Sequence, residues 1–294
     1  MKITLLGTGT PTPSLRRMSS GYLVEICDDV ILLDHGPGSH HRLMEAGKKA
    51  TDVSHLFFSH LHYDHCSDYV RLMLNRWDQA GGIIPNMKVY GPIGTRHLSE
   101  RLFGEDGAFY LDIKARTEME LSLGYYQARG GKLPRPRPEP EICELKAHDT
   151  VETDHWRLSI ANVPHAQPVL TCFAYRIDTD EGSLVYSGDA SPSKTLTSLA
   201  KDCDVLIHMC QRISGTELTA QGRISSSGHL EVAQTAQDAN VKNCVITHVT
   251  EQMDGIGMHE KLLREMGEIY DGNLIWGEDL MEIPLKGPTA RALV

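Results

Sequence analysis

The sequence predicts an α/β fold in which strands dominate both ends of the chain. Apolar runs of strand length occur at residues 2–6, 21–26 and 30–34, and strands resume up to residues 184–186. Residues 229–247 predict a helix followed directly by a strand. Strands that alternate with helices of this length indicate a helix-flanked sheet architecture.

The remaining elements follow from the same periodicities. After the first three strands, the apolar positions predict helices at about 38–47, 64–79, 94–103, 229–239 and 258–269. Short apolar runs bounded by polar or glycine residues predict further strands at about 55–59, 87–90, 156–161, 244–247 and 273–276.

The segment from His60 to His65 carries three imidazoles and one carboxylate directly after the predicted strand 55–59. His60 and His62 lie two residues apart and can reach one cation, whereas Asp64 and His65 point to a second position. Imidazole nitrogen and carboxylate oxygen are the ligands that zinc prefers in catalytic sites. The cluster therefore predicts half of a dinuclear metal site, with unrelated polar residues on a surface loop as the alternative.

Further candidate ligands occupy equivalent positions elsewhere in the chain. His165, Asp189 and His248 each lie where an apolar strand-like segment gives way to a loop. A single histidine at a strand end is more often only hydrogen-bonded. The recurrence of the same local pattern favours convergence of these side chains on one cleft, because loops on a rigid scaffold commonly present functional groups.

The chain resembles the metallo-β-lactamase superfamily over nearly all of its length, and within it the ribonuclease Z and arylsulfatase-like branch. Besides the residues above, the resemblance is carried by the stretches 1–13, 31–36, 172–178, 187–189, 228–230 and 246–248. It implies a four-layer αββα sandwich and a zinc-dependent hydrolase. Such enzymes use a hydroxide that bridges two metals to attack an electrophilic centre.

The resemblance also implies two Zn²⁺ per chain and the role of each ligand. The metal residues that it assigns are His60, His62 and His165 for one zinc, Asp64, His65 and His248 for the other, and Asp189 as the bridge. Asp64 is further expected to be catalytic, because it would accept a hydrogen bond from the hydroxide and fix its direction of attack. His62 stands where oxygen-reducing relatives carry glutamate, which favours zinc hydrolysis over redox chemistry.

His229 is the second catalytic candidate. In the ribonuclease Z pattern the matching histidine protonates the leaving group, and a glutamate from a separate motif orients it. Here Met209 stands where that glutamate is expected. Its loss removes a charge partner that would raise the basicity of His229. The alternative is a residue at a helix start with no catalytic role.

An insertion is predicted at about 104–140, within a single metallo-β-lactamase-fold domain of residues 1–294. The segment has mixed periodicity and ends in the proline alternation 134–140, which favours an extended polyproline conformation. Its aromatic residues predict either a lid over the metals or a contact between two copies in a homodimer. A solvated excursion remains the third alternative.

Composition predicts a soluble protein of the cytoplasm. The seven cysteines are scattered without framework spacing, which is typical of free thiols in a reducing compartment. The N-terminus lacks the charged and apolar regions of a signal peptide. No apolar run approaches the roughly 20 residues that a membrane helix needs.

The formal net charge of −10 disfavours nucleic acid as a partner and favours a small-molecule substrate. The basic residues are dispersed, apart from a short cluster at Arg129, Lys132, Arg135 and Arg137. We therefore predict a dizinc metallohydrolase that cleaves a small ester-type bond, such as a phosphodiester, sulfate ester or lactone. The alternatives are a ribonuclease Z-type tRNA 3′-end endonuclease, a glyoxalase II-like thioesterase and a non-catalytic ligand-binding relative.

Overall fold

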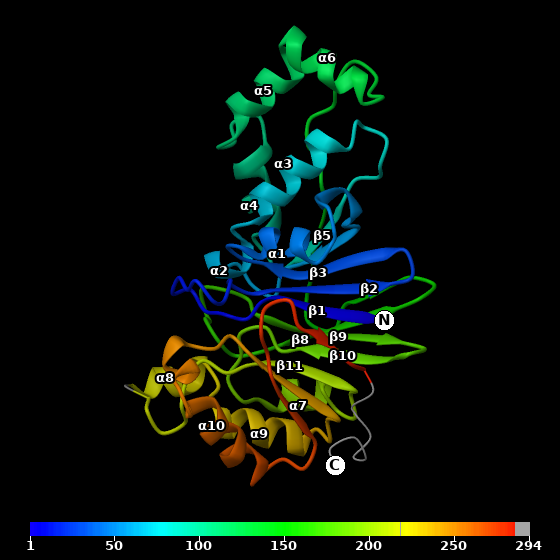
Figure 1. The fold of residues 1–294 in the computed structure, drawn as a ribbon. Helices are drawn as coiled ribbons and strands as arrows, with labels where there is room; N and C mark the ends of the chain where they lie inside the picture. Colours follow the sequence, from blue (N-terminus) through cyan, green and yellow to red (C-terminus); the bar gives the residue numbers. More distant parts are fainter. Residues whose placement is uncertain (218, 286–294) are drawn as a thin grey trace.

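Two stacked β-sheets with helices on their outer faces form the body of the molecule (Figure 1). The computed structural model describes residues 1–217 and 219–285. Each sheet has seven strands among these residues. The strand orders are β14-β1-β2-β3-β4-β5-β6 in the first sheet and β13-β12-β11-β10-β9-β8-β7 in the second. The predicted αββα sandwich is confirmed.

The first sheet is mixed. Its antiparallel part pairs β14 with β1, β1 with β2 and β2 with β3, and its parallel part runs from β3 to β6. Its strands are β1 (Lys2–Gly7), β2 (Gly21–Ile26), β3 (Asp29–His35), β4 (His55–Phe57), β5 (Lys88–Gly91), β6 (Glu141–Glu144) and β14 (Glu282–Ile283).

The second sheet is antiparallel from β7 to β10 and parallel from β10 to β13. Its strands are β7 (Thr150–Glu152), β8 (Arg157–Asn162), β9 (Phe173–Thr179), β10 (Gly182–Tyr186), β11 (Val205–Met209), β12 (Asn243–Thr247) and β13 (Asn273–Trp276).

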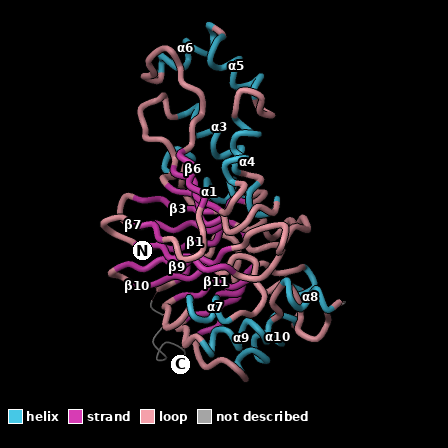
Figure 2. The backbone as a smooth tube through the Cα atoms, turned by 180° about the vertical axis from the view of Figure 1, so that it is seen from behind, coloured by secondary structure: helices cyan, strands magenta, loops and turns pink. Residues whose placement is uncertain are grey.

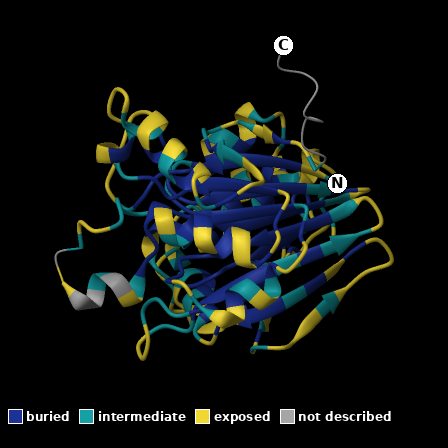
Figure 3. Ribbon diagram, turned by 90° about the horizontal axis from the view of Figure 1, so that it is seen from below, coloured by how far each residue is buried: buried dark blue, intermediate teal, exposed yellow. Residues whose placement is uncertain are grey.

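Helices close the two outer faces, as Figure 2 shows from behind. Those on the first sheet are α1 (Ser39–Glu45), α3 (Tyr69–Gln79) and α4 (Thr95–Phe103), and those on the second are α7 (Lys194–Leu199), α9 (His229–Asp238) and α10 (Met258–Gly267). Buried residues concentrate in the strands, and exposed residues are frequent in the helices and loops (Figure 3). One apolar cluster fills the space between the sheets, and two others lie beneath the helical layers.

The predicted helix 64–79 is wrong in one respect, because it is divided into α2 (Tyr63–Cys66) and α3. Asp68 lies at the division. Its backbone N–H donates to the carbonyl of His35 at 3.0 Å, and its carboxylate accepts from the N–H groups of Gly38 and His40. These tertiary bonds turn the chain after α2 and hold that short helix against the end of β3.

The insertion contains two helices, α5 (Tyr110–Glu118) and α6 (Glu120–Ala128), followed by an extended proline segment. Both helices lie at the end of the molecule farthest from the second sheet (Figure 1). Asp78 of α3 anchors the insertion, because its carboxylate accepts from Arg116 at 3.0 Å and from Arg129 and Arg135 at 3.1 Å.

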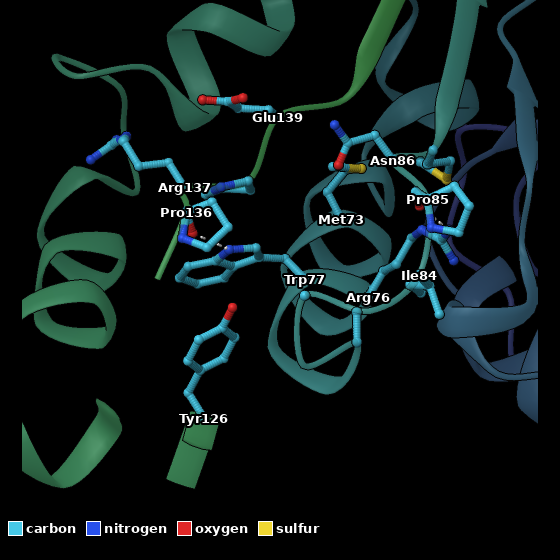
Figure 4. A pocket seen from close by; sticks show the side chains of 14 residues that line it. Met73, Arg76, Trp77, Ile84, Pro85, Asn86, Tyr126, Pro136, Arg137 and Glu139 are labelled. Atoms are coloured by element: carbon cyan, nitrogen blue, oxygen red, sulfur yellow. Dashed lines mark hydrogen bonds between the residues drawn. The ribbon is translucent and has the colours of Figure 1, made fainter. Parts of the chain in front are cut away.

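The insertion encloses a cavity of about 190 Å³ against α3 (Figure 4). The Trp77 indole lies between Pro136 and Tyr126 there, and its N–H donates to the Pro136 carbonyl at 2.9 Å. None of the predicted metal ligands lines this cavity. A role of residues 104–140 as a lid or a dimer contact stays a prediction, as does the assignment of residues 1–294 to a single domain.

Two further expectations from composition concern the thiols and the membrane. All seven cysteines are free thiols. Within residues 1–217 and 219–285, each helix is too short or too polar to span a bilayer. The cytoplasmic location stays a prediction.

Candidate metal centre

The candidate ligands all lie just beyond strand ends, at one edge of the two sheets. His60 and His62 follow β4, and Asp64 and His65 lie in α2, which begins at Tyr63, a few residues after that strand ends. In the second half of the chain, His165 follows β8, Asp189 follows β10 and His248 follows β12. Figure 1 places α2 at the same edge of the sandwich as α8 (Ala220–Ser225).

The structure brings the seven predicted ligands together in two groups. Within each group the potential ligand atoms lie within 4.8 Å of one another. The groups are His60, His62, His165 and Asp189, and Asp64, His65 and His248. This division matches the one that the resemblance implied.

In the first group three imidazoles face a common point. His62 Nδ1 lies 2.8 Å from His60 Nε2 and 3.2 Å from His165 Nε2. His165 Nε2 is also 3.5 Å from Asp189 Oδ2. Burial lowers the pKa of the His60 and His62 imidazoles, so these rings keep neutral nitrogens available to a cation.

In the second group the carboxylate of Asp64 lies between two imidazoles. Its Oδ2 is 3.4 Å from both His65 Nε2 and His248 Nε2. Asp189 contacts this group as well, because its Oδ1 is 3.4 Å from His65 Nε2 and its Oδ2 is 3.4 Å from His248 Nε2. The two oxygens of Asp189 therefore face both groups, as a bridging ligand must.

The spacing of these atoms fits ions bound between them. Two ligand atoms about 2.05 Å from one zinc ion lie about 3.3 Å apart at a tetrahedral angle and about 2.9 Å apart at a right angle. The distances above, 2.8 to 3.5 Å, cover this range. His65 Nε2 and Asp189 Oδ1 are buried and have no hydrogen-bond partner among the described residues. Buried polar atoms without partners are costly, so these two atoms are consistent with metal ligation.

Burial would favour a neutral carboxyl at Asp189, but His248 and His65 hold its pKa well below the usual value. The site thus presents an ionised carboxylate between the imidazoles. Cys66 follows His65 but is no part of either group; its thiol donates to the carbonyl of His62, and burial raises its pKa to about 12.

Asp34 is a further candidate for the site, and the sequence did not reveal its contacts. Its buried carboxylate accepts four hydrogen bonds: from the backbone N–H of Ser59 at 2.7 Å, from the Ser59 hydroxyl at 2.7 Å, from His65 Nδ1 at 2.7 Å and from the Tyr186 hydroxyl at 2.6 Å. The His65 contact fixes the tautomer that leaves Nε2 free for a metal. The position of Asp34 at the end of a matching strand was the only sequence signal.

The structure does not bring His229 into either group. Its Nδ1 accepts from the backbone N–H of Ser214 at 3.1 Å, and its Nε2 lies 2.9 Å from a carboxylate oxygen of Glu265 in α10. Met209 is buried, and the backbone N–H of Ala190 contacts its sulfur at 2.7 Å. A carboxylate partner for His229 therefore exists, but it comes from α10 rather than from position 209.

Comparison with known proteins agrees with this architecture. The family model of the metallo-β-lactamase superfamily matches residues 15–209. A ribonuclease Z from Mycobacterium sp. strain KMS is 32% identical over 253 residues, which cover 84% of this chain and 84% of that protein. A ribonuclease Z from Mycobacterium bovis strain BCG Pasteur is 28% identical over 292 residues, which cover 96% of this chain and 98% of that protein.

Two solved structures share the fold. The metallo-β-lactamase fold protein YhfI from Bacillus subtilis superposes with a TM-score of 0.74 at 19% identity and covers 96% of this chain and 98% of its own. The short form of human tRNase Z superposes with a TM-score of 0.68 at 18% identity, and the match covers 97% of this chain and 99% of that protein.

These relatives contradict one prediction. Nucleic acid was disfavoured as a partner, yet the curated relatives are named ribonuclease Z and one structural neighbour is a tRNase Z. The inference failed because the net charge of a whole chain does not report the field at one site, where bound cations set the local potential. On the family model, the relatives and the fold, the chain belongs to the metallo-β-lactamase superfamily and is a hydrolase.

Proposed function

We propose that the protein is a two-zinc phosphodiesterase that cleaves RNA in the manner of ribonuclease Z. The observation that carries this proposal is the pair of ligand groups joined by Asp189, in a chain that matches a ribonuclease Z over 84% of its length. The ligand set of imidazoles and carboxylates suits zinc, which prefers nitrogen and oxygen donors in catalytic sites.

The chain's own residues would prepare the reaction in a defined way. Zinc ions held there would supply Lewis-acid polarisation of the phosphoryl group and an activated water. Asp64 is 3.4 Å from His65 and His248, in the second group, and is proposed to bind the metal and direct the attacking water. Asp34 keeps His65 in the required tautomer through the bond to Nδ1.

The test combines metal analysis with RNA cleavage. Protein purified without chelator should contain two zinc ions per chain. At concentrations well below substrate, it should cut a pre-tRNA with a 3′ trailer at the acceptor end, and Asp189→Ala should abolish the cut. Zinc that stays below one ion per chain after reconstitution would contradict the dinuclear site. Intact pre-tRNA in the presence of two bound zinc ions would contradict the RNA substrate.

A small ester-type substrate is the second candidate, and one observation favours it. The segments that carry the ligands expose apolar side chains, among them Tyr63 beside His62 and Val169 in the loop of His165. Exposed apolar groups around a site can bind an apolar part of a substrate. Turnover of chromogenic phosphodiesters, sulfates, lactones or thioesters without RNA cleavage would support this candidate.

The role of His229 as a proton donor stays a prediction with a specific partner. We propose that Glu265, 2.9 Å from His229 Nε2, supplies the carboxylate that position 209 lacks. Because His229 Nδ1 accepts from Ser214, the ring proton lies on Nε2, and a leaving group must displace Glu265 to receive it. Loss of a general acid typically costs about 10²–10⁴-fold. His229→Ala should keep both metals and slow esters of basic alcohols more than nitrophenyl esters. Equal losses for both ester types would leave His229 as a structural residue.

A further inference from the structure

His165 and His65 are supported in different ways. His65 Nδ1 lies 2.7 Å from the buried carboxylate of Asp34, within the rigid first sheet. His165 Nδ1 instead lies 2.5 Å from the backbone carbonyl of Ser225, the last residue of α8. A proton on Nδ1 donated to that carbonyl leaves Nε2 free to face the first ligand group. The orientation of His165 therefore depends on where the chain places the end of α8.

The segment that carries α8 is attached to the body of the molecule at its two ends. Near its start, the N–H of Gln211 donates to the carbonyl of Ser227 at 3.1 Å. Near its end, the Ser227 hydroxyl donates to the carbonyl of Ala190 at 2.8 Å, beside the bridging Asp189. The six-residue α8 lies between these points, and so short a helix has little stability of its own.

Arg212 provides a further side-chain contact at the end of α8. Its Nη2 donates to the carbonyl of Ser226 at 3.1 Å, one residue beyond the carbonyl that contacts His165. Its Nη1 contacts the carboxylates of Glu217 and Glu231, the latter at 3.4 Å. The side chain is 12% exposed. Two carboxylates thus hold the guanidinium while it holds the backbone next to Ser225.

The surroundings of Arg212 are closely packed at Gly228. A Cβ atom added at Gly228 would lie 2.4 Å from the Ser214 hydroxyl and 2.7 Å from Arg212 Nη1. The Ser214 hydroxyl in turn donates to Glu231 and accepts from the N–H of Leu230 at 3.0 Å. The guanidinium therefore packs among the polar groups of Ser214, Glu231 and Ser226.

We propose that Arg212 is a positioning residue for the metal ligand His165, through the carbonyl groups at the end of α8. It sets the affinity of the first ligand group for its ion without contacting that ion, and this role rests on the metal binding proposed above. In the second ligand group, His65 does not depend on Arg212, because Asp34 fixes that ring. Partners of metal-binding histidines typically change metal affinity by about 10–100-fold when they are replaced.

The test is a zinc titration of metal-free protein against a chromogenic chelator, which measures both binding constants without reference to activity. Arg212→Ala should weaken one of the two ions by about 10–100-fold and leave the other unchanged. Arg212→Lys should recover only part of the loss, since lysine keeps the charge but lacks the fork that reaches a carbonyl and two carboxylates together.

Arg176→Ala is the matched control. Arg176 also donates to two carbonyls, those of Leu199 at 2.9 Å and Lys201 at 2.8 Å, and pairs with Asp178 at 2.9 Å. None of these partners contacts a ligand group. This variant should bind both ions like the wild type, although it loses the same kind of structural contact.

Several outcomes would overturn the proposal. The proposal is wrong if folded Arg212→Ala binds both zinc ions with wild-type affinity, or if it loses affinity equally at both sites. It is also wrong if Arg176→Ala loses as much zinc affinity as Arg212→Ala. If Arg212→Ala fails to fold, wild-type zinc affinities at both sites of Arg212→Lys would contradict the proposal. A wild-type protein that binds a single ion would refute both proposals. Two ions and the expected loss, without RNA cleavage, would refute only the RNA substrate.

Discussion

Replacement of Asp34 by asparagine should weaken the second ligand group while the fold is kept. Asp34 has a backbone φ of 57°, a left-handed conformation that asparagine also tolerates. Its Oδ2 accepts from Ser59, His65 and Tyr186, and its Oδ1 accepts from the N–H of Ser59. The amide oxygen can serve only one side, so it should face the three donors and leave its NH₂ against the N–H of Ser59.

The magnitude follows from these four bonds. One buried donor without an acceptor costs about 1–3 kcal/mol. The bond to His65 loses its charge assistance, and charge-assisted bonds are about twice as strong as neutral ones. We therefore expect zinc affinity at one site to fall by about 10–100-fold, which corresponds to about 1.4–2.7 kcal/mol.

Competitive zinc titration measures this loss, and Asp204→Asn is its control. Asp204 accepts from the N–H and hydroxyl of Ser183 at 2.7 and 3.0 Å, as Asp34 does from Ser59, but its remaining partner is Lys242. Both variants should unfold at lower urea concentrations than the wild type, and only Asp34→Asn should lose metal. Full binding of two ions by Asp34→Asn would refute the reasoning.

Three further predictions concern the metals, the insertion and pH. Asp189→Ala should lower the occupancy of both sites in elemental analysis, because its carboxylate faces both ligand groups; loss of one ion only would contradict the bridge. Asp78→Ala should destabilise the protein by about 1.5–3 kcal/mol in urea unfolding, because it removes the carboxylate that pairs with the buried Arg135. Asp112→Ala removes only the exposed ion pair with Arg116 and should cost less than about 1 kcal/mol. Burial lowers the pKa of His208 from 6.5 to about 4 in the folded protein. As the pH falls from 6.5 toward 4, the unfolded chain therefore binds a proton at His208 that the folded protein does not, and the free energy of unfolding decreases. His208→Leu should remove about 2 kcal/mol of that loss at pH 5, and an unchanged pH dependence of unfolding would contradict this.

The sequence predicted most of the fold and the residues that the structure brings together in the two groups, because both depend on local patterns. A strand that ends in a histidine or an aspartate is visible within a few residues, and His165, Asp189 and His248 all follow this pattern. The division of the helix at Asp68 was not predicted, since it depends on a backbone bond to the distant carbonyl of His35. The helices of the insertion were missed because their outer faces expose apolar residues, Leu111 and Leu121 among them, which obscures the periodicity.

The partners of the ligands were hidden for a related reason. Asp34 and His65 are 31 residues apart, and His229 and Glu265 are 36 residues apart, so no short motif joins either pair. For His229, the absence of a glutamate at position 209 suggested that the charge partner was lost. In the structure, the carboxylate of Glu265 in α10 contacts His229 instead. A missing motif residue is therefore weak evidence that a charge partner is missing from the folded site.

The contact of His165 is harder still to find in a sequence. Its partner at Nδ1 is a backbone carbonyl, which every residue carries, so the identity of Ser225 contains no information about the bond. What the sequence does specify is Arg212, whose guanidinium holds the neighbouring carbonyl of Ser226. Selection on such a contact would act on the arginine and on Gly228, which leaves space for it, rather than on the residue that touches the metal ligand. If Arg212 acts as proposed, the residue that orients this ligand is found from its contact with the backbone and not from a motif that contains His165.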